Sequence, residues 1–141
     1  MEKSENYQKL AESWLIEKNL DRFMTVLVVH DEKYKPDESK LLGKIVKTAK
    51  YHDLVIDVDV FIVIREDYLD ELEFTHNIEQ RDLAFERILE YINWDAENDK
   101  FVKVKPDFIE HSGMVKNYGF DKIEANKIAI QQIIEKMEEN S

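Results

Sequence analysis

Apolar residues recur along the chain with two different periods, and their alternation predicts the order of helices and strands. Ser4 can cap an N-terminal helix that ends near Asn19, because apolar residues follow it at the spacing of one helical face: Tyr7, Leu10, Ala11, Trp14 and Leu15. The run 23–29 (FMTVLVV) is short and rich in β-branched residues, which is typical of a strand. The segment 41–51 fits either a short amphipathic helix or a second strand with a lysine-rich face.

The run 54–64 (LVIDVDVFIVI) carries the clearest strand signal. Alternation places Asp57 and Asp59 on one face of this strand, and a row of branched apolar residues on the other: Ile56, Val58, Val60, Ile62 and Ile64. Residues 66–72 are then predicted to form one or two helical turns, and residues 78–92 a long helix. The buried stripe of that long helix consists of Phe85, Ile88, Leu89 and Ile92.

The C-terminal part begins with a predicted hairpin over 94–104 (WDAENDKFVKV), whose turn lies at 95–99. Pro106 opens a short helix that ends at Tyr118–Gly119, and Asp121 with Glu124 forms a capping box for the last helix. The apolar face of that helix is Ile123, Ile130, Ile133, Ile134 and Met137. This order predicts a single α+β domain over 1–141, with an N-terminal helix, a short mixed sheet, a central helix, a hairpin and two C-terminal helices.

Composition narrows the classes of partner. Twenty basic and 31 acidic residues give the chain of 141 residues a net charge of −11. Nucleic acids and anionic membrane surfaces favour Lys and Arg, so neither is a predicted partner. The chain has no cysteine, which excludes disulfides, thiolate metal sites and a cysteine nucleophile. Residues 1–13 hold no apolar signal core and no 18-residue apolar run occurs, so we expect a cytoplasmic protein.

Few residues suggest chemistry by their spacing. The four histidines, His30, His52, His76 and His111, are all more than ten residues apart and form no local metal-binding pattern. Asp57 and Asp59 fit either a paired acid and base or a hard-cation site, or else the solvated outer face of a sheet. Glu86 and Glu90 lie one helical turn apart and repel mildly, which a metal, a partner cation or water would relieve. No cofactor is predicted.

Residues 55–120 nevertheless resemble a known family. The segments that carry the resemblance are 57–72 (DVDVFIVIREDYLDEL), 83–92 (LAFERILEYI), the hairpin 94–104 and 105–119 (KPDFIEHSGMVKNYG). In this order they look like the small bacteriophage metallopeptidases of zincin, SprT-like type. In that family a strand and turn precede a helix with the motif HExxH, and a hairpin and a KPD…YG segment follow. The resemblance implies a small zincin-like domain, encoded by a phage and located in the host cytoplasm.

The chain departs from the family at the motif itself. Two histidines at i and i+4 would bind zinc and the glutamate would act as general base, but the chain reads Phe85-Glu86-Arg87-Ile88-Leu89. Both ligand positions are apolar, and only the glutamate remains. The family's later acidic position corresponds to Glu110, with His111 beside it. The resemblance therefore implies a domain that has lost its metal and its peptidase activity, and we expect no catalytic residue.

The first functional hypothesis is a non-catalytic protein that binds another protein, for example as an acidic inhibitor of a host or defence protein. Its predicted interaction surface is a set of acidic residues in the long helix and the hairpin: Glu79, Asp82, Glu86, Glu90, Asp95, Glu97 and Asp99. A second hypothesis is a metal-dependent hydrolase with relocated ligands, drawn from Glu86, Glu90, Glu110, His111 and Asp57 or Asp59. A third is a structural or accessory protein that forms homo-oligomers through the helix 122–138.

Overall fold

A computed structural model describes residues 2–36, 41–47, 58–95, 97–98, 100–103 and 112–139. Four strands form a mixed sheet in the order β1 (Glu2–Lys3), β2 (Val26–His30), β4 (Val60–Ile64) and β3 (Gly43–Lys47). β2 and β4 are parallel, whereas β1 and β3 run antiparallel to their neighbours. Of the two alternatives for the segment 41–51, helix or strand, the structure shows a strand over 43–47. Residues 48–51 lie outside the described residues.

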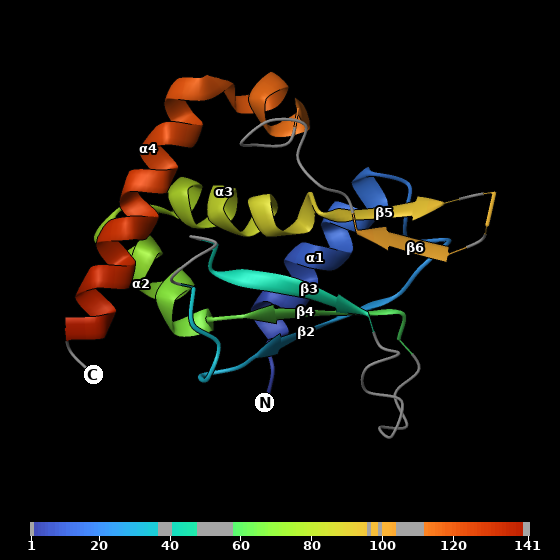
Figure 1. Cartoon of the computed structure of the whole chain (residues 1–141), viewed down its shortest axis with the longest axis horizontal. Helices are drawn as coiled ribbons and strands as arrows, with labels where there is room; N and C mark the ends of the chain where they lie inside the picture. The colour runs from blue at the N-terminus through green and yellow to red at the C-terminus, as the bar shows by residue number, and fades with distance from the viewer. Residues whose placement is uncertain are drawn as a thin grey trace.

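The described helices are α1 (Glu5–Glu17), α2 (Glu66–Thr75), α3 (Ile78–Leu89) and α4 (Ser112–Glu139). The predicted hairpin is formed by β5 (Ile92–Asp95), which pairs with β6 (Lys100–Lys103). Figure 1 shows α3 lying along β3 while α2 and the later part of α4 gather at one end of the molecule and the hairpin projects at the other. The predicted α+β class is confirmed. No helix in the described part of the chain is long and apolar enough to cross a membrane.

β4 differs from its prediction because both of its faces are covered. Val60, Ile62 and Ile64 face the main core, as expected, but Phe61 and Val63 are 4% and 1% exposed on the other face, where they pack with Val29. This face of β4 is therefore covered, whereas Asp59, directly before the strand, is exposed as on a solvated outer face. The expected alternation also fails before Val60. Val58 was expected on the same face as Val60, but it packs with Phe61 and Val63 on the other face. A central strand with neighbours on both sides can be apolar on both faces, and alternation cannot reveal this. Residues 54–57 lie outside the described residues.

Helix α1 is fastened to the sheet by one buried amide. Gln8 Nε2 donates to the carbonyl of Val26 at 3.0 Å, and Gln8 Oε1 accepts from the N–H of Val28 at 2.7 Å. The backbone N–H of Ser4 donates to Val28 O at 2.9 Å. The side chain thus satisfies polar groups on the edge of β2 beyond the short β1, which fixes α1 against that strand.

The long helix predicted over 78–92 is shorter than expected. The side chain of Asn77 caps its start by accepting from the N–H of Gln80 at 2.8 Å, and α3 ends at Leu89. Ile92 is buried as predicted, but it belongs to β5 rather than to the helix. The segment 66–72 is instead longer than predicted, since α2 extends to Thr75.

The C-terminal segment α4 contains the predicted break at Gly119, whose backbone lies at φ +81° and ψ 160°. After the break, Ile123, Ile130, Ile133 and Ile134 are buried against the rest of the chain, and Met137 is partly buried. The predicted apolar face is confirmed, and it packs within the chain. Pro106 and the expected helix start near it lie outside the described residues.

Candidate functional site: a cleft between three helices

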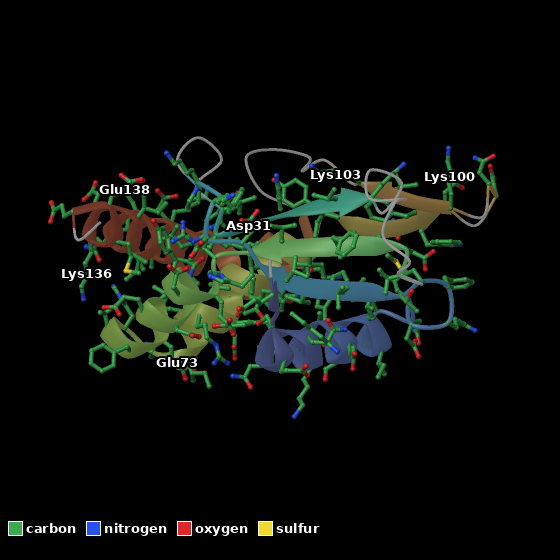
Figure 2. All side chains as sticks on the ribbon, turned by 90° about the horizontal axis from the view of Figure 1, so that it is seen from below. Asp31, Glu73, Lys100, Lys103, Lys136 and Glu138 are labelled. Carbon is green, nitrogen blue, oxygen red and sulfur yellow. The ribbon has the colours of Figure 1, made fainter. Side chains whose placement is uncertain are left out.

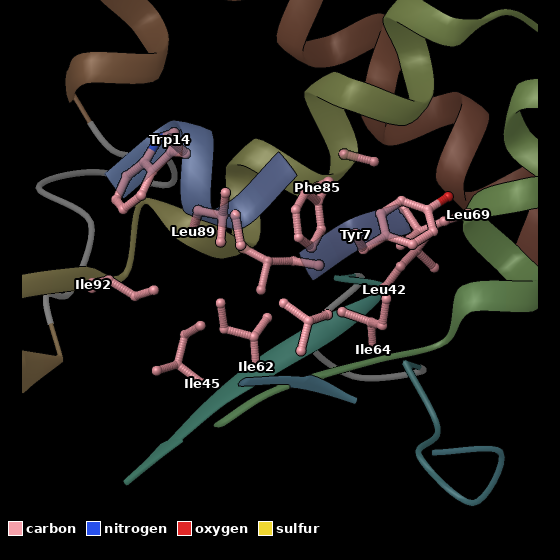
Figure 3. Close-up of a cluster of buried hydrophobic side chains, with 14 of the residues drawn as sticks. Tyr7, Trp14, Leu42, Ile45, Ile62, Ile64, Leu69, Phe85, Leu89 and Ile92 are labelled. Atoms are coloured by element: carbon pink, nitrogen blue, oxygen red, sulfur yellow. The ribbon is translucent and has the colours of Figure 1, made fainter. Parts of the chain in front are cut away.

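The predicted stripe of α3 forms part of the main hydrophobic core. Phe85 and Leu89 are each only 2% exposed. The ring of Phe85 lies 5.2 Å from that of Tyr7 in α1, at an angle of 60°. Figure 3 shows both α3 side chains in a row with Tyr7 and Trp14, above the sheet residues Ile45 and Ile62. Phe85 and Leu89 therefore belong to the main core.

Beside these core residues, α1, α3 and the first part of α4 enclose a cleft of about 450 Å³. Its apolar wall is made by Leu10, Trp14, Phe85 and Leu89. Its polar wall is made by Ser13, Glu17, Asp82, Glu86, Asn117 and Tyr118. Among the described residues, three carboxylates from two helices therefore lie beside this apolar wall.

Glu86 is held in place from α4. The hydroxyl of Tyr118 donates a short hydrogen bond to Glu86 Oε2. Burial raises the pKa of Tyr118 above its ordinary value, and the hydrogen bond and negative charge of Glu86 raise it further. The phenol is thus kept protonated as a donor, and the carboxylate keeps its second oxygen for another partner.

The other two carboxylates differ in their surroundings. Asp82 accepts two hydrogen bonds from its neighbour Arg81, at 3.1 and 2.7 Å, so its charge is partly balanced. Arg81 also binds Glu73 in α2 at 3.0 Å. Glu17 reaches the cleft from the last turn of α1 and is exposed. Glu17 and Glu86 therefore contribute most of the negative charge that faces the cleft.

Trp14 lines the cleft and carries a buried hydrogen-bond donor. The residue is only 7% exposed, and its Nε1–H has no acceptor among the described residues. The Nε1–H of Trp94 in β5 is also buried without an acceptor among these residues. A buried donor without an acceptor is uncommon in folded proteins and costs free energy.

The predicted acidic surface is divided by the structure. α3 has 12 residues and β5 has four, so Glu79 and Glu97 lie at opposite ends of a line roughly 30 Å long. Glu90 follows the end of α3 and is half-buried, with Lys18 Nζ 4.0 Å from its Oε1. Of the described residues in the predicted acidic surface, Asp82 and Glu86 line the cleft, and the binding role of the surface stays a prediction.

The hairpin part of that surface is also not uniformly acidic. Asp95 accepts from the side chain of Asn98 at 2.7 Å and from the backbone N–H groups of Glu97 and Asn98, and these bonds lower the pKa of Asp95. Its cross-strand partner is Lys100. Figure 2 shows Lys100 and Lys103 at this end of the molecule. Asp95 thus shapes the turn, while Asp99 lies outside the described residues.

Those residues of the predicted alternative metal ligands that the structure describes form no metal site. Within the described ranges, no group of three or more histidine and carboxylate side chains is placed to hold a metal ion. Asp59 accepts from the backbone N–H of Thr25 at 2.8 Å and fixes the loop before β2. Asp57, Glu110 and His111 lie outside the described residues.

Two of the four histidines have defined structural contacts. His30 Nδ1 accepts from the first N–H of α2, that of Glu66, at 3.0 Å. His76 Nε2 lies 3.2 Å from Gln132 Oε1 in α4. His30 also borders a second depression of about 540 Å³, lined by Glu2, Asp31, Glu32 and Lys33. His52 and His111 lie outside the described residues.

Comparison with known proteins finds no matching family model, no matching curated protein and no matching solved structure. The candidate site therefore rests on its own geometry. Sequence patterns pointed to Asp82 and Glu86 but missed Trp14, Glu17 and Tyr118, since residues from three helices meet only after folding.

Proposed function

We propose that this chain is a non-catalytic binding protein that takes a basic segment of another protein on the face of the cleft. The observation that carries the proposal is the arrangement around α3. Phe85 and Leu89 are core residues, and the carboxylates of Asp82 and Glu86 border a cleft above them. A net charge of −11 supports the choice of a basic partner, since opposite charge speeds encounter and disfavours acidic competitors.

The sequence resemblance to phage metallopeptidases supports the non-catalytic part of this proposal. In such a domain, Phe and Leu at the two ligand positions convert a polar metal face into core, and each buried side chain contributes roughly 1.5–3 kcal/mol. The partner in this proposal is a host or defence protein whose basic, nucleic-acid-binding groove the acidic chain occupies.

The test measures binding of the whole protein to an array of basic, neutral and acidic 15-residue peptides at increasing salt. Wild-type protein is expected to bind basic peptides alone, with affinity that falls as salt rises. The variant Asp82→Asn with Glu86→Gln should lose most of this binding. The matched control, Glu135→Gln with Glu139→Gln, removes the same charge from the end of α4 and should retain it.

Two results would contradict the proposal. Equal losses in the cleft and control variants would mean that net charge alone attracts the peptides. A stoichiometric zinc or manganese ion in the purified protein, with a melting temperature that drops by many degrees in EDTA, would favour the hydrolase hypothesis instead.

A further inference from the structure

We infer that the cleft receives the side chain of a single arginine from the partner's basic segment, an inference that rests on the proposed binding function. The volume of about 450 Å³ is near the lower end of the range for small-ligand sites, roughly 300–1,000 Å³. Such a cleft holds one long side chain rather than a helix. The occupant must therefore be recognised by the chemistry of one residue.

The charge of the cleft selects a cation. Among the described residues, its lining contains Glu17, Asp82 and Glu86 and no basic side chain. Tyr118 binds only one oxygen of Glu86, and Glu17 reaches the same cleft from α1. A cation between these two carboxylates would be attracted from both sides, above an apolar floor that weakens screening by water.

The acceptors around the cleft favour arginine over a compact cation. The partly exposed Leu10 offers apolar surface to a methylene stem, beside Trp14 and Leu89, which are almost fully buried. Arginine is also less strongly hydrated than lysine and presents five donors in a fixed plane. Ser13 and Asn117 add oxygen acceptors on the polar wall for the donors that the carboxylates do not reach.

The indole of Trp14 reports on occupation of the cleft. Trp14 lines the cleft, whereas Trp94 lies in β5 and is not among the described residues that line it. A peptide that places its arginine beside Glu17 and Glu86 changes the surroundings of Trp14. The indole N–H resonance of Trp14 is therefore expected to move in a spectrum where Trp94 serves as internal reference.

The experiment titrates the ¹⁵N-labelled protein with capped Gly-Arg-Gly and with the matched citrulline and lysine peptides. The Trp94→Phe variant assigns the two indole resonances. The arginine peptide is expected to shift the Trp14 resonance saturably, with a Kd of the order of 1 mM for so small a ligand. The citrulline peptide, equal in shape but uncharged, should bind at least about tenfold more weakly, and the lysine peptide should fall between them.

Variants locate the contact. Glu17→Gln and Glu86→Gln should each weaken the arginine peptide several-fold, while the control Glu135→Gln leaves it unchanged. Equal affinity for arginine and citrulline, or a Trp14 resonance that stays fixed while Trp94 moves, would overturn the inference. If basic 15-residue peptides still bind in that case, the proposed binding function survives without the arginine site. If neither binds, both fail.

Discussion

The hydroxyl of Tyr118 and the carboxylate of Glu86 join α4 to α3 across the mouth of the cleft. Tyr118 comes directly before the break at Gly119, so this bond fixes the first part of α4 where its own helix ends. A hydrogen bond to a charged group contributes roughly 1.5–3 kcal/mol when buried. Because both side chains are only half-buried and water competes for the bond, we expect about 1 kcal/mol, below that range.

Tyr118→Phe is expected to lower the free energy of unfolding by about 1 kcal/mol, since it removes the donor and keeps the ring. Urea denaturation of the wild type, Tyr118→Phe, Glu86→Gln and the double variant measures the coupling between the two residues. We expect a coupling energy of about 1 kcal/mol. Strictly additive effects of the two single variants would show that the bond contributes nothing.

A pH prediction follows from Tyr7. Its hydroxyl donates to Asp70 at 2.9 Å, and burial first, then this bond, raises the pKa of Tyr7 above the ordinary value of 10.0. Above pH 10 the unfolded chain therefore loses this proton while the folded chain keeps it. Stability conferred by the neutral phenol is complete below pH 10 and falls above it, by up to about 1.4 kcal/mol per pH unit.

The measurement compares the urea stability of wild type and Tyr7→Phe at pH 8, 10 and 11. The advantage of the wild type should begin to shrink at pH 10, where half of the unfolded chains have lost this proton, and should shrink further at pH 11, because the variant has no phenol to ionise. Parallel profiles across the whole range would show that folding leaves the ionisation of Tyr7 unchanged.

Gln8 shows what sequence patterns can and cannot predict. Its neighbours Tyr7, Ala11, Trp14 and Leu15 follow helical spacing, so the helix and its buried face were predictable. The burial of Gln8 was not, because its amide faces the edge of a strand 18 and 20 residues later. The cleft escaped prediction for the same reason. Periodicity reports which face of one element is buried, but not which polar groups from distant elements share a site.

The change Gln8→Ala should destabilise the fold by about 2 kcal/mol or more, since it leaves a buried N–H and a buried carbonyl of β2 without partners. Equilibrium unfolding in urea gives the value. Gln131→Ala is the matched control, because Gln131 bonds only the exposed Glu135, at 3.1 Å, along the same helix. The control should stay within about 0.5 kcal/mol of wild type. A Gln8→Ala variant as stable as the control would refute the fastening role of this amide.

Gly119 and Gly43 should resist alanine for different reasons. A Cβ at Gly119 meets nothing within 4 Å, so Gly119→Ala suffers only from its backbone angles, at about 1–3 kcal/mol. At Gly43 a Cβ would lie 2.7 Å from the carbonyl oxygen of Val63 and 2.8 Å from Ile88 Cδ1. Adding Ile88→Val should therefore recover part of the stability lost in Gly43→Ala and none of that lost in Gly119→Ala. Unfolding of the two pairs measures this, and equal recovery would contradict the distinction.

The last prediction concerns two buried positions of the cleft wall, Phe85 and Leu89. Phe85→His combined with Leu89→His places two histidines at i and i+4 on α3, the spacing that binds zinc on one helical face. Both side chains are 2% exposed and face the core, so imidazoles there would be buried among apolar groups without polar partners. We expect a loss of roughly 2–4 kcal/mol for each substitution, and no rescue by zinc.

Phe85→Leu with Leu89→Met is the matched control, because it perturbs the same packing without polar atoms and should cost less. Urea unfolding of both double variants with EDTA or with equimolar zinc gives the comparison. If the histidine pair bound zinc stoichiometrically and regained wild-type stability, the two positions would tolerate a metal site, and their assignment to the apolar core would be wrong. An unstable pair that ignores zinc means instead that Phe85 and Leu89 belong to the core, and that any binding at the cleft depends on the carboxylates beside them.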